Sequence, residues 1–135
     1  GMIQREVALR MASAPGTKSY GILSVLIQAW YDVEYLFTVD ENVFNPPPKV
    51  KSAVIRMTRN GVSDLGCDWQ LFRRVVKTVF NQRRKMLRVS LRQIFPDTKA
   101  HAALFDSEMM TMRPEQLTIQ QFVELTNLVE REGGK

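Results

Sequence analysis

Residues 43–57 read VFNPPPKVKSAVIRM, in which a lone aromatic residue comes shortly before three consecutive prolines and a strand-like run. Proline fixes φ near about −65° and lacks a backbone N–H, so residues 46–48 should follow an extended path outside any β-ladder. On either side, VEYLFTV at residues 33–39 and SAVIRMT at residues 52–58 are rich in β-branched and aromatic side chains. We therefore predict two antiparallel strands joined by a wide connection over residues 40–51.

Phe44 lies beside this stiff segment. An aromatic side chain that is held still before it meets a ligand loses less entropy when it stacks. Phe44 is therefore a candidate ligand contact, and the alternative is a core residue that anchors the loop. Lys49 and Lys51 follow the prolines, and each has two open roles, binding a phosphate group or lying solvated at the surface.

Two helices are predicted before the strands. Apolar residues recur at helical spacing between residues 3 and 11, which predicts a short helix over residues 4–12, and the turn SAPG at 13–16 ends it. The run ILSVLIQAWY at residues 22–31 is apolar nearly all round. Such a pattern is typical of a helix that is buried inside something larger than this chain.

The composition changes after Arg59. The stretch NGVSDLGCD is rich in turn-forming residues, and nothing beyond it resembles a strand. We predict a helix from about Asp68 to Phe95, stopped by Pro96, a short helix over 98–105, and a last helix that starts at a capping box of Thr118 and Gln121. The predicted domains are residues 1–60, with both strands, and residues 61–135, which are all helical.

The first predicted helix of the second domain carries a strongly basic face. Residues 71–92 contain eight basic residues and no acidic one, in a chain whose net charge is +5. One continuous helix would gather all of them except Arg83 into an arc of roughly 120°. Arg83 would fall on the apolar side, so we predict a break or kink at Asn81–Gln82, with Asn81 as the cap of the second segment. The basic residues are Arg73, Arg74, Lys77, Arg83, Arg84, Lys85, Arg88 and Arg92.

This face predicts an anionic partner. Solvated helix faces usually mix signs for intrahelical pairing, and eight basic residues without an acid repel one another. Nucleic acid or another polyanion would relieve that repulsion. The alternative is an ordinary solvated helix face.

Several classes of function are excluded or disfavoured by what the sequence holds. One His and one Cys cannot supply a metal site, and the seven glycines do not form a nucleotide-binding loop. His101 is interpreted as a surface or packing residue and Cys67 as a bystander. A single cysteine cannot form an internal disulfide framework, which favours a reducing cytoplasm. The longest apolar run, within GILSVLIQAWY, is far short of the roughly 20 residues that cross a bilayer.

Three separated segments resemble the ribosomal RNA adenine dimethyltransferase family of the KsgA type. MIQREVALRM at 2–11 with YGILSVLIQAW at 20–30 is similar to its M-L-Q-K-E-V-A and Y-G-x-L-S-V stretches. VFNPPPKVKSAVIRM is similar to its F-x-P-x-P-K-V-x-S-A-V signature, and FNQRRKMLRVSL at 80–91 to its F-N-Q-R-R-K-x-x-R-x-S-L helix. The segments follow in family order along nearly the whole chain.

The resemblance implies an α+β fragment that begins at the family's fifth strand. Residues 1–60 would be the C-terminal end of a Rossmann-like methyltransferase domain, with two antiparallel strands plus helices, and residues 61–135 a small helical RNA-binding domain. The family's glycine-rich S-adenosylmethionine loop, its acidic ribose-binding residue and its Asn-Leu-Pro-Tyr tetrapeptide are not in this sequence. The chain alone should therefore neither bind the cofactor nor transfer methyl groups.

For the parent enzyme, the resemblance implies transfer of methyl groups from S-adenosylmethionine to two adjacent adenines of small-subunit ribosomal RNA. The implied setting is the cytoplasm, with small-subunit RNA or the pre-30S particle as partner and neither a metal nor a membrane. Phe44 would pack against the target adenine after that base leaves its helix. The predicted RNA-binding residues are Lys49, Arg73, Arg74, Lys77, Asn81, Gln82, Arg83, Arg84, Lys85, Arg88 and Arg92.

Two other readings stay open. An erythromycin-resistance type methyltransferase shares the F-x-P-x-P motif and acts on large-subunit RNA, but its C-terminal helices match FNQRRK less closely. A non-enzymatic RNA-binding module of ribosome assembly would also carry such a basic face. An incomplete sheet would expose its edges, so we also expect a non-physiological dimer through residues 1–60.

Overall fold

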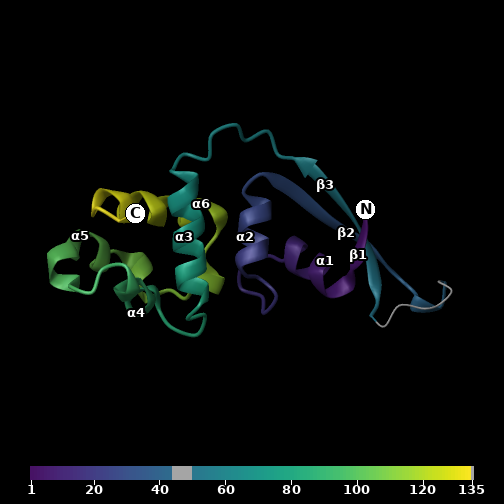
Figure 1. Ribbon diagram of the computed structural model, residues 1–135, viewed down its shortest axis with the longest axis horizontal. Coiled ribbons are helices and arrows are strands. Elements are labelled where there is room, and N and C mark those ends of the chain that lie inside the picture. Colours follow the sequence, from purple (N-terminus) through teal and green to yellow (C-terminus); the bar gives the residue numbers. More distant parts are fainter. Residues whose placement is uncertain (44–49, 135) are drawn as a thin grey trace. The chain divides into compact units, whose positions relative to one another are not determined.

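The computed structural model describes residues 1–43 and 50–134, and the proline segment with Phe44 and Lys49 lies outside the described residues (Figure 1). The chain is α+β and divides into two compact units, Gly1–Val62 and Ser63–Lys135. The three strands lie in the first unit, and the regular elements in the described residues of the second unit are all helices. No helix in the described part of the chain is long and apolar enough to cross a membrane.

The first unit is built on a three-stranded antiparallel sheet. Its strands are β1 (Met2–Gln4), β2 (Tyr31–Val39) and β3 (Ser52–Arg59), in the order β1-β3-β2. The predicted pairing of two antiparallel strands is confirmed, and a bulge lies between Tyr35 and Phe37. A short 3₁₀ segment, Glu41–Val43, follows β2.

Strand β1 was not predicted. Its register pairs Ile3 with Ala53, whereas the sequence pattern assigned Ile3 to the following helix. A strand of three residues is too short to show a period of two, and it forms because β3 offers it a partner. The predicted pair of strands is therefore corrected to three.

Two helices accompany the sheet, α1 (Arg5–Ala12) and α2 (Ile22–Gln28). Helix α1 lies beside the sheet (Figure 1). It packs there through a core of Ala8, Met11, Ala53 and Ile55. In α2, Val25 is fully buried while Leu23 remains 36% exposed. The predicted short helix over residues 4–12 is thus confirmed to within one residue at its start.

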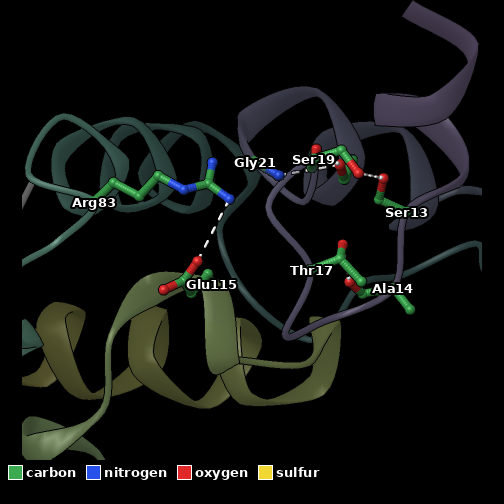
Figure 2. Close-up of polar contacts among 8 residues, drawn as sticks. Ser13, Ala14, Thr17, Ser19, Gly21, Arg83 and Glu115 are labelled. Atoms are coloured by element: carbon green, nitrogen blue, oxygen red, sulfur yellow. Dashed lines mark hydrogen bonds and ion pairs between the residues drawn. The ribbon is translucent and has the colours of Figure 1, made fainter. Parts of the chain in front are cut away.

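A polar network joins the end of α1 to α2 (Figure 2). The hydroxyl groups of Ser13 and Ser19 lie 2.6 Å apart, and the fully buried Ser24 donates to the Arg10 carbonyl and accepts from the Gly21 N–H. The Gln28 amide donates to the carbonyls of residues 11 and 13, at 2.8 Å each. Backbone groups that α1 leaves open at its C-terminus are satisfied in this way.

Over residues 63–134, the second unit contains four α-helices, α3 (Trp69–Phe80), α4 (Leu87–Ser90), α5 (Ala102–Phe105) and α6 (Ile119–Arg131). Short 3₁₀ segments lie between them, at Leu91–Gln93, Thr98–His101, Glu108–Thr111 and Pro114–Gln116. The predicted capping box at the start of α6 is confirmed, because Thr118 Oγ1 accepts from the Gln121 N–H and Gln121 Oε1 accepts from the Thr118 N–H. The predicted short helix over residues 98–105 is present as a 3₁₀ segment that continues into α5.

The long helix predicted over residues 68–95 is interrupted. The predicted break at Asn81 is confirmed, but Asn81 is the C-cap of α3 rather than a cap for the second segment, which has Met86 at its N-cap. The Asn81 N–H still bonds to the Lys77 carbonyl, after which the chain turns. The Leu87 N–H then donates to the Met112 carbonyl at 2.9 Å. Because this hydrogen bond joins Leu87 to a distant segment, the backbone after Asn81 does not continue the axis of α3.

Candidate nucleic-acid interface

Helix α3 separates its core side from its basic side. Five of its residues are buried, Leu71, Phe72, Val75, Val76 and Val79. The opposite side carries two rows of residues at i,i+4 spacing, 70–74–78 and 73–77–81. Between them lies a shallow hollow of about 300 Å³, lined by Gln70, Arg73, Arg74, Lys77, Thr78 and Asn81.

This hollow suits a phosphate group. It combines two guanidinium groups with an ammonium group and contains no carboxylate. Guanidinium groups match phosphate oxygens in a bidentate geometry, and an ammonium group adds a compact point charge. The Thr78 hydroxyl already donates to the Arg74 carbonyl at 2.7 Å, so the neutral donors left for a ligand are the amides of Gln70 and Asn81.

The basic surface continues beyond α3 on the turn after Phe80 and on the next two segments. Arg84 and Lys85 are exposed in the turn, Arg88 is exposed on α4, and Arg92 is exposed in the 3₁₀ segment that follows. Because α3 ends at Phe80, the single 120° arc expected for a continuous helix does not extend past Lys77. The basic residues instead occupy consecutive segments of one unit.

Arg83 differs from its neighbours. Its Nη2 lies 3.7 Å from Glu115 Oε2 (Figure 2), and its guanidinium carbon lies 5.7 Å from the centre of the Phe80 ring. Arg83 is also half-buried, in keeping with its expected place on the apolar side of the helix. The remaining seven basic residues of the face form no ion pair with any carboxylate in the described part of the chain.

Seven cations with no interspersed acid repel one another, and no carboxylate of the described residues lies within ion-pair distance of them. The repulsion is relieved when a polyanion binds along the surface. A double-helical nucleic acid has the matching property, a regular series of phosphates presented by a stiff backbone. The arrangement can therefore hold a nucleic acid through its backbone without reading base edges.

The other candidate residues of the first unit are only partly described. Phe44 and Lys49 lie outside the described residues, while Lys51 is exposed and its carbonyl accepts the Arg5 N–H at 2.8 Å. The β1–α1 junction does not fit the phosphate or cofactor cradle of a nucleotide-binding strand–turn–helix unit. Strand β1 runs directly into α1 at Gln4–Arg5, where a cofactor cradle would need a glycine-rich turn between strand and helix.

Cys67 and His101 contact other residues of the second unit and do not belong to the basic surface. Burial raises the pKa of the Cys67 thiol to about 11, so the thiol stays protonated at neutral pH and is a poor nucleophile. The His101 ring centre lies 4.3 Å from that of Phe95, and its Nδ1 lies 3.2 Å from Glu132 Oε1. Over residues 1–43 and 50–134, no group of His, Cys, Asp and Glu is arranged to hold a metal ion.

Sequence reasoning missed three residues of this surface. Gln70 and Thr78 line the hollow, and both lie four residues from Arg74, so helical spacing was a signal that could have found them. Glu115 could not be found in this way, because it lies on a 3₁₀ segment far along the chain from Arg83. Only the tertiary structure brings that pair together.

Comparison with known proteins identifies the family to which the chain is similar. Residues 2–131 match the family model of ribosomal RNA adenine dimethylase. A ribosomal RNA small subunit methyltransferase A of Bacteroides thetaiotaomicron is 63% identical over 130 residues, which cover 96% of this chain and 48% of that protein. The protein of the same name in Porphyromonas gingivalis is 56% identical, over 97% of this chain and 50% of its own length. The chain thus spans about half the length of the curated relatives it matches.

Solved structures agree with this fold. A dimethyladenosine transferase from Plasmodium falciparum superposes with a TM-score of 0.80 at 20% identity, over 98% of this chain and 57% of its own. The 23S rRNA methyltransferase ErmE gives a TM-score of 0.54 at 23% identity, over 93% of this chain and 53% of its own. The family model covers nearly the whole chain, and the resemblance carried by the three sequence segments is confirmed. The chain belongs to the ribosomal RNA adenine dimethylase family.

Proposed function

We propose that this chain is the C-terminal part of an S-adenosylmethionine-dependent enzyme that dimethylates two adjacent adenines of small-subunit ribosomal RNA in the cytoplasm. Family membership supports the reaction class. Relatives more than 60% identical are named small subunit methyltransferases, which favours small-subunit RNA over large-subunit RNA as the substrate. Within that enzyme, this part holds the RNA, in free form or in the pre-30S particle.

The observation that carries the RNA-binding role is the unpaired basic surface of the second unit. Seven basic residues on α3, the following turn, α4 and the next 3₁₀ segment have no carboxylate partner among the described residues. Duplex RNA is recognised mainly through its phosphates, its 2′-hydroxyl groups and its shape. Cations fixed on short rigid elements meet that requirement.

We assign a different role in the enzyme to each of the two units. In our proposal, residues 1–60 form the end of a Rossmann-like methyltransferase domain and residues 61–135 form the RNA-binding domain. S-adenosylmethionine would supply the methyl group, and in this proposal other parts of the enzyme would hold it. The present chain would then contribute RNA affinity and the segment that bears Phe44, and by itself would transfer no methyl group.

Binding of the 135-residue chain to RNA transcripts tests the proposal. We expect the chain to bind a small-subunit ribosomal RNA transcript more tightly than a large-subunit transcript, with log affinity falling linearly against log salt concentration. Fluorescence anisotropy over a salt series measures both quantities. Tighter binding to the large-subunit transcript would favour an erythromycin-resistance type enzyme, and equal binding to both would leave only a general RNA-binding module.

Phe44→Ala in the complete enzyme tests the proposed role of Phe44. We expect single-turnover methylation to slow by roughly five-fold to 150-fold, because stacking on a flipped base contributes about 1 to 3 kcal/mol. RNA affinity and its salt dependence should stay nearly unchanged, since Phe44 would contact one base only after it has flipped. Phe44→Tyr and Phe44→Trp serve as controls and should retain much of the rate. An Ala variant that melts earlier but reacts at the normal rate would make Phe44 a core anchor instead.

A further inference from the structure

Arg83, Arg84 and Lys85 are consecutive in sequence but lie in different surroundings. Arg84 and Lys85 are exposed and have no carboxylate partner in the described part of the chain. The Arg83 side chain is only 34% exposed, and its Nη2 lies 3.7 Å from Oε2 of Glu115 (Figure 2). Its guanidinium group also lies over the Phe80 ring. A cation that already has an anion and an aromatic ring beside it is poorly placed to neutralise a phosphate as well.

The turn that carries these residues is held at several points. The Gln82 N–H donates to the Val79 carbonyl and the Lys85 N–H to the Gln82 carbonyl, at 3.2 and 2.9 Å. Just beyond the turn, the Leu87 N–H donates to the Met112 carbonyl. These bonds hold the backbone of the turn, and among its side chains Arg83 contacts both Glu115 and Phe80.

Glu115 is itself well supported. It lies in the 3₁₀ segment Pro114–Gln116, whose first residue is buried. The segment is capped, because the Arg113 N–H donates to Gln116 Oε1 at 2.9 Å. The Glu115 side chain is 27% exposed, so its carboxylate lies in a defined place rather than in open solvent.

We propose that Arg83 is a positioning residue whose pairing with Glu115 holds the 81–85 turn, so that Arg84 and Lys85 are already ordered when they meet RNA phosphates. The inference rests on the proposed RNA-binding function. With side chains 34% and 27% exposed, the ion pair is still screened by solvent and contributes little to folding stability. Its effect on binding is larger, because side chains that are ordered in advance lose less entropy when they bind.

Glu115→Gln tests the inference through the sign of its effect. In the full chain binding a short RNA duplex, we expect affinity to fall by about three- to ten-fold, with an unchanged salt slope and melting temperature. A carboxylate with no positioning role would act in the opposite direction, since removing a negative charge near a polyanion strengthens binding. Glu124→Gln is the matched control, an exposed carboxylate on α6 with no described ion pair, and should leave affinity unchanged or slightly raised. Unchanged or tighter binding by Glu115→Gln would overturn the inference.

The salt slope of RNA binding distinguishes a positioning role of Arg83 from direct phosphate binding by Arg84. Arg84→Gln should reduce the magnitude of the slope by about 0.7 to 0.9, the contribution of one neutralised phosphate, whereas Arg83→Gln should lower affinity and leave the slope as it is. Exchanging the two charges, Arg83→Glu with Glu115→Arg, should recover most of the affinity that Arg83→Glu alone loses. A smaller slope in Arg83→Gln, equal to that of Arg84→Gln, would make Arg83 a direct phosphate ligand and refute the positioning role while the proposed function stands. If Arg84→Gln and Arg83→Gln both leave binding unchanged, the proposed RNA-binding role of this turn fails as well.

Discussion

Replacing Arg84, Lys85 and Arg88 together with Gln is expected to reduce the magnitude of the salt slope of RNA binding by about 2.1 to 2.7. Each neutralised phosphate contributes about 0.7 to 0.9 to that slope, because binding releases condensed counterions from the nucleic acid. Extrapolated from 1 M to 0.1 M salt, three lost contacts correspond to an affinity loss of about 100- to 500-fold. The three side chains are exposed on the turn and on α4, so their replacement should leave the fold intact.

A second triple variant controls for net charge. Arg5, Lys99 and Arg131 are also exposed, have no described ion pair and lie outside the basic face. Changing them to Gln removes the same three positive charges from a chain with a net charge of +5. If binding depends only on the total charge, both triple variants lose affinity equally. A steep loss in the first and a small loss in the second would localise the RNA to the basic face, and an unchanged slope in the first would show that the RNA binds elsewhere.

Local sequence patterns were enough to predict much of the fold. The two longer strands have the β-branched and aromatic composition that a pleated surface favours, and β2 and β3 form where they were expected. The capping box at Thr118 is equally local, since both of its hydrogen bonds join residues three apart. Features of this kind are determined within a few residues, which is why the sequence alone predicts them.

Other features depend on partners that are distant in sequence. Strand β1 is ordered by β3, some 50 residues later, and the turn after Phe80 departs from α3 toward the Met112 carbonyl. Asn81 shows what local sequence cannot decide. Asn is compatible with either end of a helix, and the tertiary structure makes Asn81 the C-cap of α3. The Arg83–Glu115 pair is of the same kind. Phe44 and Lys49 lie outside the described residues, and their roles stay predictions.

Phe122→Ala is expected to lower the free energy of unfolding of the second unit by about 3 to 5 kcal/mol. Phe122 is fully buried, and its ring meets Phe72 edge-on at 6.5 Å between centroids and Phe80 at 5.8 Å. Both partners belong to α3, so this aromatic cluster joins α6 to the helix that begins the basic face. Truncation leaves a cavity and removes two ring contacts from a small core, which has few other residues to compensate.

The two tryptophans allow the measurement to be assigned to one unit. Trp69 stacks on Phe72 in the second unit, at 5.5 Å between ring centroids, and Trp30 belongs to the first. In a Trp30→Phe background, fluorescence during urea unfolding therefore reports the second unit alone. Phe37→Ala is the matched control, because Phe37 is 56% exposed on β2 and its loss should leave the Trp69 transition in place.

The consequence for function follows from the position of the aromatic cluster. If Phe122 holds α3 against α6, its loss should weaken RNA binding by lowering the fraction of folded chains, and binding should recover on cooling toward the temperature of maximum stability. The salt slope of the chains that remain folded should match that of the unaltered protein, because no phosphate ligand has been removed. A Phe122→Ala variant with an unshifted urea midpoint would show that α6 is not needed to hold α3. The rigidity of the basic face would then have to come from the turn and its Arg83–Glu115 pair alone.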